Sequence, residues 1–115
     1  MPDLARDFLI CTIRLHVLYR ASRAPIYGVE MLEELRRHGY PMSPGTLYPV
    51  LHEMYADGYL ECERRVIAGK ARKYYRATDM GIQALQAARP KIRDFIAEVL
   101  HDASHVPGTR EEADV

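Results

Sequence analysis

Six basic residues within a span of thirteen give the sequence its strongest chemical signal. Positions 64 to 76 contain no acidic residue, and their cations are Arg64, Arg65, Lys70, Arg72, Lys73 and Arg76. Cations concentrated in this way bind nucleic-acid phosphates, because binding releases the counterions condensed on the backbone. The alternative is a basic surface that is only hydrated.

The overall charge hides this concentration. The 115 residues carry sixteen Lys and Arg and sixteen Asp and Glu, so the formal net charge is zero. Residues 1–76 contain twelve basic and nine acidic side chains, whereas residues 77–115 contain four and seven. The net charges of the two parts are therefore +3 and −3, and the neutrality of the chain does not argue against a nucleic-acid partner.

A second set of polar residues occurs where the apolar residues Leu47, Val50 and Leu51 recur at helical spacing. The side chains on the opposite face of that helix are Gly45, Tyr48, Pro49 and His52, with Thr46 and Glu53 at its margin. Small and hydroxyl-bearing residues suit a helix that enters the major groove of DNA. None of them reads a base with two hydrogen bonds, so DNA shape is expected to contribute. For Tyr48 the alternative is a half-buried ring that closes the turn.

The remaining reactive residues indicate no metal, cofactor or catalytic centre. Cys11 and Cys62 are too few and too distant for a metal motif or a disulfide framework, and indicate reduced thiols, with a thiol sensor as the alternative. His101 and His105 offer only two metal ligands at a helix end, where they complement the helix dipole. The other histidines are scattered: His16, His38 and His52. No glycine-rich phosphate loop or nucleophile motif is present, so we expect no enzymatic activity.

The first element that must position these residues is a helix from Leu4 to about Ser22, which has no internal Gly or Pro. It is apolar on two faces, so it needs its own domain on one side and a distant segment or a second subunit on the other. One face carries Leu4, Phe8, Cys11, Leu15 and Leu18; the opposite face carries Leu9, Ile10, Ile13 and Val17.

Two further helices are predicted from Tyr27 to His38 and from about Ser43 to Asp57, each stopped by a glycine. The start of the later helix has two alternatives, because Pro49 cannot donate an intrahelical hydrogen bond. Either Thr46 is the N-cap and Pro49 lies in the first turn, or Ser43 is the N-cap and one bond is missing.

A β-hairpin is predicted from Tyr59–Ile67 and Arg72–Ala77 around the loop 68–71. Thr78 is the expected N-cap of a last helix, in which Pro90 should cause a kink or an interruption. Its stripe of residues suited to packing against another helix is Ile82, Leu85, Ile92, Ile96 and Val99. The predicted fold is mainly α with a β-hairpin, a winged helix-turn-helix with additional N- and C-terminal dimerisation helices.

This fold divides the chain into three parts. Residues 1–78 are the expected winged-helix DNA-binding domain, which includes the N-terminal helix. Residues 79–102 are the C-terminal dimerisation helix, and residues 103–115 are a flexible tail that lacks apolar periodicity. The N-terminus is neither a signal peptide nor a membrane span, so a cytoplasmic protein without membrane contact is expected.

Four stretches stand out together: Ile26–Met31, Ser43–Leu51, Asp57–Leu60 and Arg72–Thr78, the last followed by Gly81. In their order and spacing they resemble the PadR family of transcriptional regulators. The most specific part is Gly-Thr-Leu-Tyr-Pro followed by Lys-Tyr-Tyr-Arg-x-Thr, whereas Val29 departs from the Tyr that many relatives have. The resemblance implies a winged-helix homodimer whose N- and C-terminal helices interleave between subunits, and which binds operator DNA and usually represses.

The resemblance also assigns roles to residues. It places Ser43, Thr46 and Tyr48 on the DNA-facing helix, and Lys70, Arg72 and Lys73 on the wing. Tyr74 is also expected among the DNA-binding residues of the wing. The expected dimer interface comprises Leu9, Ile13, Val17, Leu85, Ile92, Phe95, Ile96 and Val99. Some relatives bind aromatic or drug-like effectors at this interface, so a small apolar or aromatic effector is an expected partner. Its candidate lining, unless these residues are ordinary core, is Phe8, Tyr19 and Phe95.

We therefore expect a homodimeric, sequence-specific DNA-binding regulator, a repressor on a pseudo-palindromic operator that a small-molecule effector releases. The alternative is a winged-helix module for protein–protein contact without specific DNA binding. The basic hairpin and the polar helix face favour the first of these.

Overall fold

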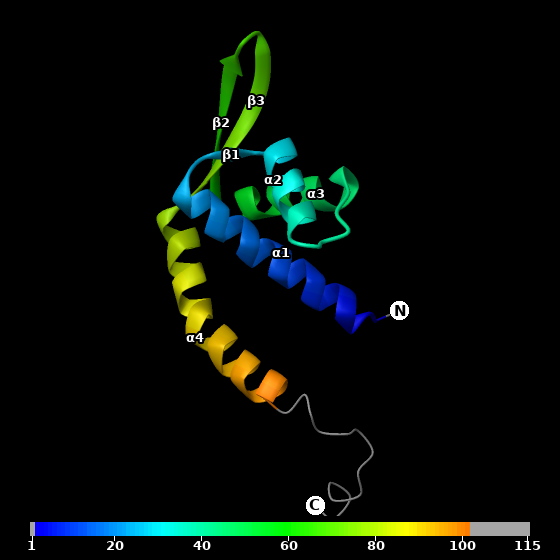
Figure 1. Ribbon diagram of the computed structural model, residues 1–115. Coiled ribbons are helices and arrows are strands. Elements are labelled where there is room, and N and C mark those ends of the chain that lie inside the picture. The colour runs from blue at the N-terminus through cyan, green and yellow to red at the C-terminus, as the bar shows by residue number, and fades with distance from the viewer. Residues whose placement is uncertain (1, 102–115) are drawn as a thin grey trace, which may run out of the picture. The chain divides into compact units, whose positions relative to one another are not determined.

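The computed structural model describes residues 2–101, so residue 102 of the expected last helix and the expected tail at 103–115 lie outside the described residues. The elements in chain order are α1 (Leu4–Arg23), β1 (Ile26–Tyr27), α2 (Gly28–Arg37), α3 (Pro44–Ala56), β2 (Leu60–Ile67), β3 (Lys70–Ala77) and α4 (Asp79–His101) (Figure 1). This is the mainly helical fold with a β-hairpin that the sequence predicts. In residues 2–101, no helix is long and apolar enough to cross a membrane.

The chain divides into two compact units, residues 1–85 and 86–115. In the first unit, α1 begins with an N-cap in which the Asp3 side chain accepts a hydrogen bond from the Arg6 backbone N–H at 3.1 Å. Ile13 and Val17 of this helix are fully buried in the core, whereas Leu4 is 83% exposed. Thus the expected apolar face that contains Ile13 and Val17 packs inside the domain. The other expected face is exposed at its first residue, Leu4.

Helices α2 and α3 form the helix-turn-helix. Their connection is held by Arg36, whose Nε donates to the Met42 carbonyl at 2.9 Å. Ser43 is the N-cap of α3 and Pro44 stands in its first turn, which suits the fixed backbone angle of proline. Pro49 lies inside the helix. The second of the two predicted starts, with Ser43 as the N-cap, is therefore the one observed.

The three strands form an antiparallel sheet in the order β1-β3-β2. The hairpin of β2 and β3 turns through only Ala68 and Gly69, both with positive φ angles of 53° and 79°, as a two-residue hairpin turn requires. The loop is thus shorter than predicted. Strand β1 was not predicted: Tyr27, which the sequence placed in a helix, pairs with Tyr74 of β3. Two residues are too few to show the alternation by which strands are recognised.

The first turns of α4 belong to the unit of residues 1–85. Thr78 caps this helix, since its hydroxyl accepts from the Gly81 N–H at 3.0 Å and donates to the Gly58 carbonyl at 2.6 Å. A Cβ at Gly81 would collide with the backbone carbonyl of Tyr59, and Leu85 is 7% exposed. The helix then continues through Pro90, so of the expected kink or interruption at this proline, the interruption is absent.

Candidate nucleic-acid interface

Helix α3 separates its buried and exposed residues as its spacing predicts. The buried side is formed by Leu47, Val50, Leu51 and Met54. Of the residues expected to face DNA, Thr46 is half-buried and the others are exposed: Ser43, Gly45, Tyr48, Pro49 and His52. The helix contains no Lys or Arg. Its outer face therefore offers hydroxyl groups, one imidazole and little bulk, and no positive charge of an Arg or Lys.

Tyr48 packs against the first residue of α2. A Cβ built on Gly28 would lie 2.5 Å from Tyr48 Cε1, so only glycine leaves room for the ring in this position. The Tyr48 side chain nevertheless stays 43% exposed. The ring closes the turn and also reaches the surface. The two interpretations of Tyr48, a ring that closes the turn and a side chain that faces DNA, are therefore compatible.

The register of the hairpin assigns its side chains to two faces, because neighbouring residues on a strand point to opposite sides and cross-strand partners to the same side. The helix-side face contains Leu60, Cys62, Arg64, Val66, Ala71, Lys73, Tyr75 and Ala77. The outer face contains Glu61, Glu63, Arg65, Ile67, Lys70, Arg72, Tyr74 and Arg76. Leu60 and Ala77 are buried in the core. Tyr75 and Lys73 line a cleft with Tyr48 of α3, so this face adjoins the recognition helix; of the outer-face residues, Arg72 lines the same cleft.

Two of the six hairpin cations are paired with carboxylates on the outer face. Arg65 Nη2 lies 3.0 Å from Glu63 Oε2, and Arg76 Nε lies 3.7 Å from Glu61 Oε1. The Arg65 guanidinium also stands 5.0 Å from the centre of the Tyr74 ring. These acidic partners precede the basic run in the sequence, so the charge counted from residue 64 onwards overstates what is available to a phosphate.

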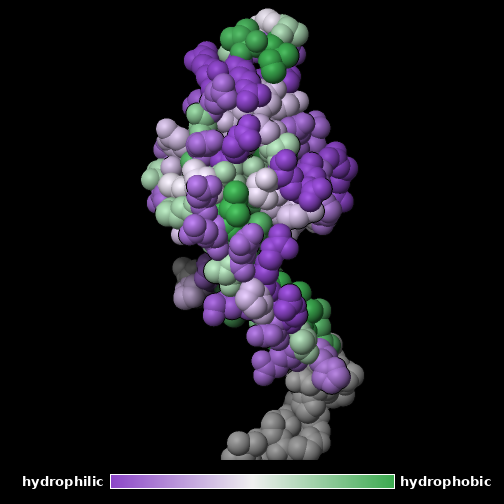
Figure 2. All heavy atoms as spheres, turned by 90° about the vertical axis from the view of Figure 1, so that its left-hand side faces the viewer, coloured by the Kyte–Doolittle hydropathy of each residue, from purple (hydrophilic) through white to green (hydrophobic). Residues whose placement is uncertain are grey.

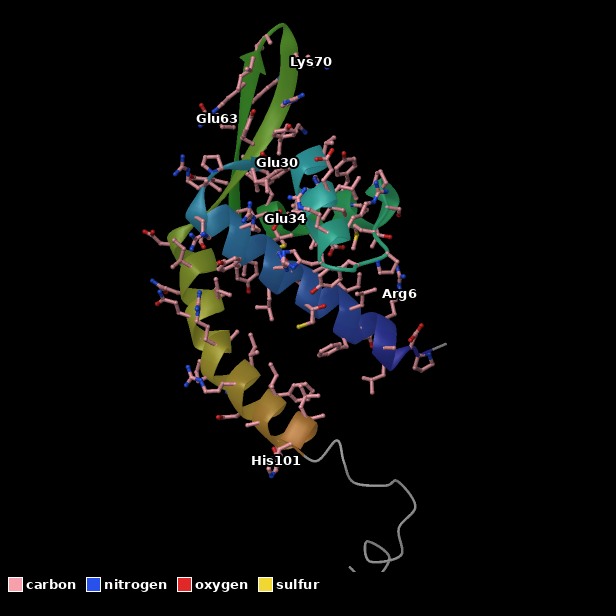
Figure 3. The ribbon with its side chains drawn as sticks, in the orientation of Figure 1. Arg6, Glu30, Glu34, Glu63, Lys70 and His101 are labelled. Atoms are coloured by element: carbon pink, nitrogen blue, oxygen red, sulfur yellow. The ribbon has the colours of Figure 1, made fainter. Side chains whose placement is uncertain are left out.

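Arg72 has a different kind of partner, because its guanidinium lies over the Tyr27 ring of β1 at 4.2 Å from the ring centre. Within residues 2–101, Arg64, Lys70 and Lys73 have no carboxylate or aromatic partner. Lys70 begins β3 beside the turn of the hairpin (Figure 3). Three cations thus keep their charge fully available, and Arg64 and Lys73 are cross-strand neighbours on the helix-side face.

A cleft of about 430 Å³ lies where α2, α3 and β3 meet. It is lined by Tyr27, Gly28, Val29, Tyr48, His52, Arg72, Lys73 and Tyr75. Burial first, and then the neighbouring Cys62 thiol, raise the pKa of Tyr75, so its hydroxyl stays protonated and can donate a hydrogen bond. Tyr27 and Tyr75 are not among the site residues that the sequence predicts. Tyr27 reaches the cleft only because β1 pairs with β3, which local spacing does not show.

The end of the hairpin is apolar. Val66 and Ile67 are 70% and 49% exposed, and Figure 2 shows hydrophobic side chains at the top of the molecule, above a hydrophilic band. Apolar residues beside cations on a protruding hairpin resemble the wedges that some proteins place in the minor groove of DNA.

The residues expected at a dimer interface differ in burial and fall into three groups. Ile13, Val17 and Leu85 lie in the core of their own domain, at 0%, 0% and 7% exposure, and have no surface to offer a partner. Leu9 and Ile92 are half-buried. In the part of α4 that lies in the second unit, the exposed apolar residues are Phe95, Ile96, Val99 and Leu100.

The described histidines are less scattered than their spacing indicates. His16 of α1, Glu34 of α2 and His38 at the end of α2 lie together. The signal available in the sequence was the four-residue spacing of Glu34 and His38 on one helix. The other pair of potential metal ligands is His101 and His105, of which His105 lies outside the described residues. Both cysteines are free thiols, with Cys11 exposed and Cys62 half-buried.

Comparison with known proteins gives consistent matches. Residues 15–87 match the model described as "Transcriptional regulator PadR-like family". The chain is 46% identical over 103 residues to "Transcriptional regulator Rv3488" of Mycobacterium tuberculosis, covering 90% of this chain and 96% of that protein. A PadR-like transcriptional regulator of Bacillus cereus has a similar structure, with a TM-score of 0.79, 26% identity, and 87% and 99% of the two chains covered. A PadR family regulator of Eggerthella lenta has a TM-score of 0.72 at 27% identity, with 90% and 100% covered.

Proposed function

Because the chain belongs to the PadR-like family of transcriptional regulators, we propose that it is a cytoplasmic homodimeric repressor that binds a pseudo-palindromic operator through α3 and the wing. Family membership makes it a DNA-binding regulator of transcription and not an enzyme. The observation that carries the finer proposal is the position of Arg64 and Lys73, two unpaired cations on the same hairpin face as Tyr75, which shares a cleft with Tyr48 of α3.

The charge and size of the side chains indicate different roles in DNA binding for α3 and the wing. Helix α3 has no Lys or Arg, and its slim N-terminal half with Ser43, Gly45 and Thr46 suits entry into the major groove. The phosphate contacts then come from Arg64, Lys70 and Lys73 of the wing. Because these contacts are independent of sequence, specificity depends on hydroxyl contacts, on DNA shape and on the spacing of the two half-sites.

The proposed dimer surface uses Leu9 of α1 and the exposed residues of the second unit, among them Ile96 and Val99. It leaves out Ile13, Val17 and Leu85, which the core already covers. A two-fold dimer would present two α3 helices to half-sites about one helical turn, or roughly 34–36 Å, apart, or a multiple of that distance. We also propose that a small apolar or aromatic effector acts at this interface, with Phe8, Tyr19 and Phe95 as candidate lining.

An electrophoretic mobility shift with the DNA upstream of the protein's own gene tests the DNA-binding proposal. We expect a discrete shifted band at about 50 to 200 mM salt that unlabelled operator removes and unrelated DNA does not. A chain that shifts no DNA at the lower salt concentration is a protein-contact module instead. A band that unrelated DNA removes equally well contradicts specific recognition.

The dimer proposal is tested with Ile96→Asp, which places a charge in the proposed contact surface. Because an unpaired charge is costly to bury, we expect the variant to be monomeric in multi-angle light scattering. Gln83→Asp, at an exposed position of α4 in the first unit, is the matched control and should remain dimeric. A dimeric Ile96→Asp variant would contradict this surface.

A further inference from the structure

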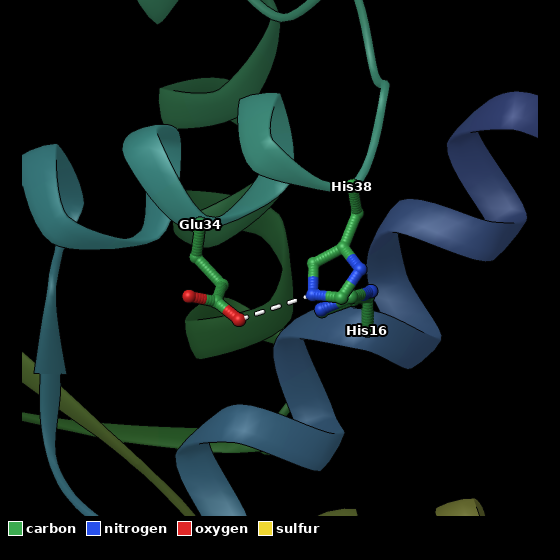
Figure 4. Close-up of side chains that lie close together, drawn as sticks. All are labelled: His16, Glu34 and His38. Atoms are coloured by element: carbon green, nitrogen blue, oxygen red, sulfur yellow. Dashed lines mark hydrogen bonds and ion pairs between the residues drawn. The ribbon is translucent and has the colours of Figure 1, made fainter.

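His16, Glu34 and His38 form a cluster in the domain of residues 1–85 that the DNA-binding proposal does not use. One ring nitrogen of each histidine and one carboxylate oxygen of Glu34 lie within 4.8 Å of one another. The first histidine comes from α1, the glutamate from α2 and the second histidine from the residue that ends α2. Figure 4 shows the two imidazole rings near each other and tilted, on one side of the carboxylate.

The cluster contains a polar atom with no partner. His16 Nε2 is buried and makes no hydrogen bond, although buried polar atoms in proteins are nearly always bonded. The His16 and His38 ring centres are 4.7 Å apart, and His38 Nε2 lies 3.1 Å from Glu34 Oε1. Three residues thus bring potential ligand atoms within 4.8 Å of one another, and one of these residues has a buried ring nitrogen without a hydrogen-bond partner.

Glu34 supplies the negative charge of the cluster, and its two oxygens have different neighbours. Arg37 pairs with Oε2, whereas Oε1 faces the histidines. The hydrogen bond from Arg37 is the main cause that lowers the pKa of Glu34, and burial, followed by the proximity of His38, lowers the pKa of His16.

Two neighbouring positive charges oppose a bound cation: Arg37, which pairs with Glu34 Oε2, and Arg20. Arg20 Nη1 lies 3.8 Å from Glu34 Oε1, and its side chain is 36% exposed, so its guanidinium can turn towards solvent. Its Nε is buried and has no hydrogen-bond partner. The cost of moving Arg20 makes this a site of moderate rather than extreme affinity, and removing its charge should strengthen binding.

We propose that His16, Glu34 and His38 bind a divalent transition-metal ion such as Zn²⁺, which links α1 to the end of α2. Two imidazoles and one carboxylate are the donor set of zinc sites that retain an open position for water. Side-chain rotation must bring the ligand atoms to about 3.3 Å from one another, as bond lengths of about 2.0–2.1 Å require. Imidazole donors select Zn²⁺, Ni²⁺ or Cu²⁺ over Mg²⁺ and Ca²⁺, which prefer sites built from oxygen.

The test is a titration of the purified full-length chain with ZnCl₂, by calorimetry and by competition with a chromophoric zinc chelator. We expect one Zn²⁺ per chain and no binding of Mg²⁺. His38→Ala should reduce the affinity at least about tenfold, since even changes beside metal ligands have effects of that size. His38 is exposed, so this variant should fold, and far-UV circular dichroism verifies that it does.

His101→Ala is the matched control, because it removes an exposed histidine outside the cluster and should bind Zn²⁺ as the unaltered chain does. His16→Gln should lose affinity like His38→Ala, and Arg20→Gln should gain it. Wild-type affinity in both His16→Gln and His38→Ala, a loss in His101→Ala, or no zinc uptake by the unaltered chain would each overturn the proposal. The titration contains no DNA, so its outcome is independent of the proposed function.

Discussion

The two faces of the wing carry the same net charge of +2 but carry it in different ways. The helix-side face has two cations, Arg64 and Lys73, and no acid, whereas the outer face has four cations and two carboxylates. On the outer face, Arg65 and Arg76 are each paired with a glutamate. On the helix-side face, neither cation has a carboxylate partner in residues 2–101, and both extend the surface that begins at Tyr75.

This difference shows that the charge available to a ligand depends on pairing and direction as well as on composition. A surface ion pair contributes little to stability, but the carboxylate partly neutralises the positive charge of its partner. A cation without such a partner exchanges only water and counterions when it meets a phosphate. The two faces are therefore expected to contribute unequally to DNA binding despite their equal net charge.

The largest expected effect comes from removing the cations of the helix-side face. Arg64→Ala with Lys73→Ala should weaken operator binding at least about tenfold, and should make the slope of log affinity against log salt about 0.9 less steep for each lost phosphate contact. Fluorescence anisotropy between about 50 and 200 mM salt measures both quantities.

The matched control is Arg65→Ala with Arg76→Ala, which changes the net charge of the chain by the same amount on the other face. We expect this variant to lose less affinity and to keep a steeper salt slope. Equal slopes in the two double variants would mean that both faces meet DNA alike, and the comparison between them would fail.

A smaller effect is expected for Tyr48→Phe, which leaves the ring on Gly28 and removes only the hydroxyl. Loss of one hydrogen bond to DNA should cost about 1 kcal/mol, or about fivefold in affinity. Because no charge changes, the salt slope should remain that of the unaltered protein. An altered slope in the same anisotropy titration would show that Tyr48 acts through the position of the wing.

The smallest effect is expected where the outer face is made to resemble the helix-side face. Glu61→Gln with Glu63→Gln releases Arg65 and Arg76 from their partners, and should raise the affinity for unrelated DNA by a few-fold, in line with the ~0–1 kcal/mol of exposed ion pairs. Competition between operator and unrelated DNA checks this. Unchanged affinity for unrelated DNA would show that the outer face lies away from the duplex.

Much of the fold was predictable because it depends on local spacing. The apolar stripe of Leu47, Val50 and Leu51 predicted α3, and the Gly-containing interval at 68–71 predicted the hairpin, although the turn itself is only 68–69. Helix and strand periods are properties of neighbouring residues, and the sequence displays them directly. The short strand β1 escaped prediction because two residues show no period, and its partner lies about fifty positions away in β3.

The candidate site was predictable in its residues but not in its geometry. The six cations and the polar face of α3 were visible in the sequence, and they lie on the wing and on the exposed side of that helix. The expected dimer residues Ile13 and Val17 were misleading, since an apolar residue on a helix looks the same whether its own domain or a second subunit covers it.

The sequence by itself determined the helices, the hairpin, the basic run and the family of this protein, because each depends on the types of residues that lie close together in the sequence. Only the tertiary structure decided which cations are paired, that Tyr75 stands beside Tyr48, and that His16 meets Glu34 and His38. These facts depend on strand register and on the packing of α1 against α2. Both are set by the whole core at once, and no local spacing records them.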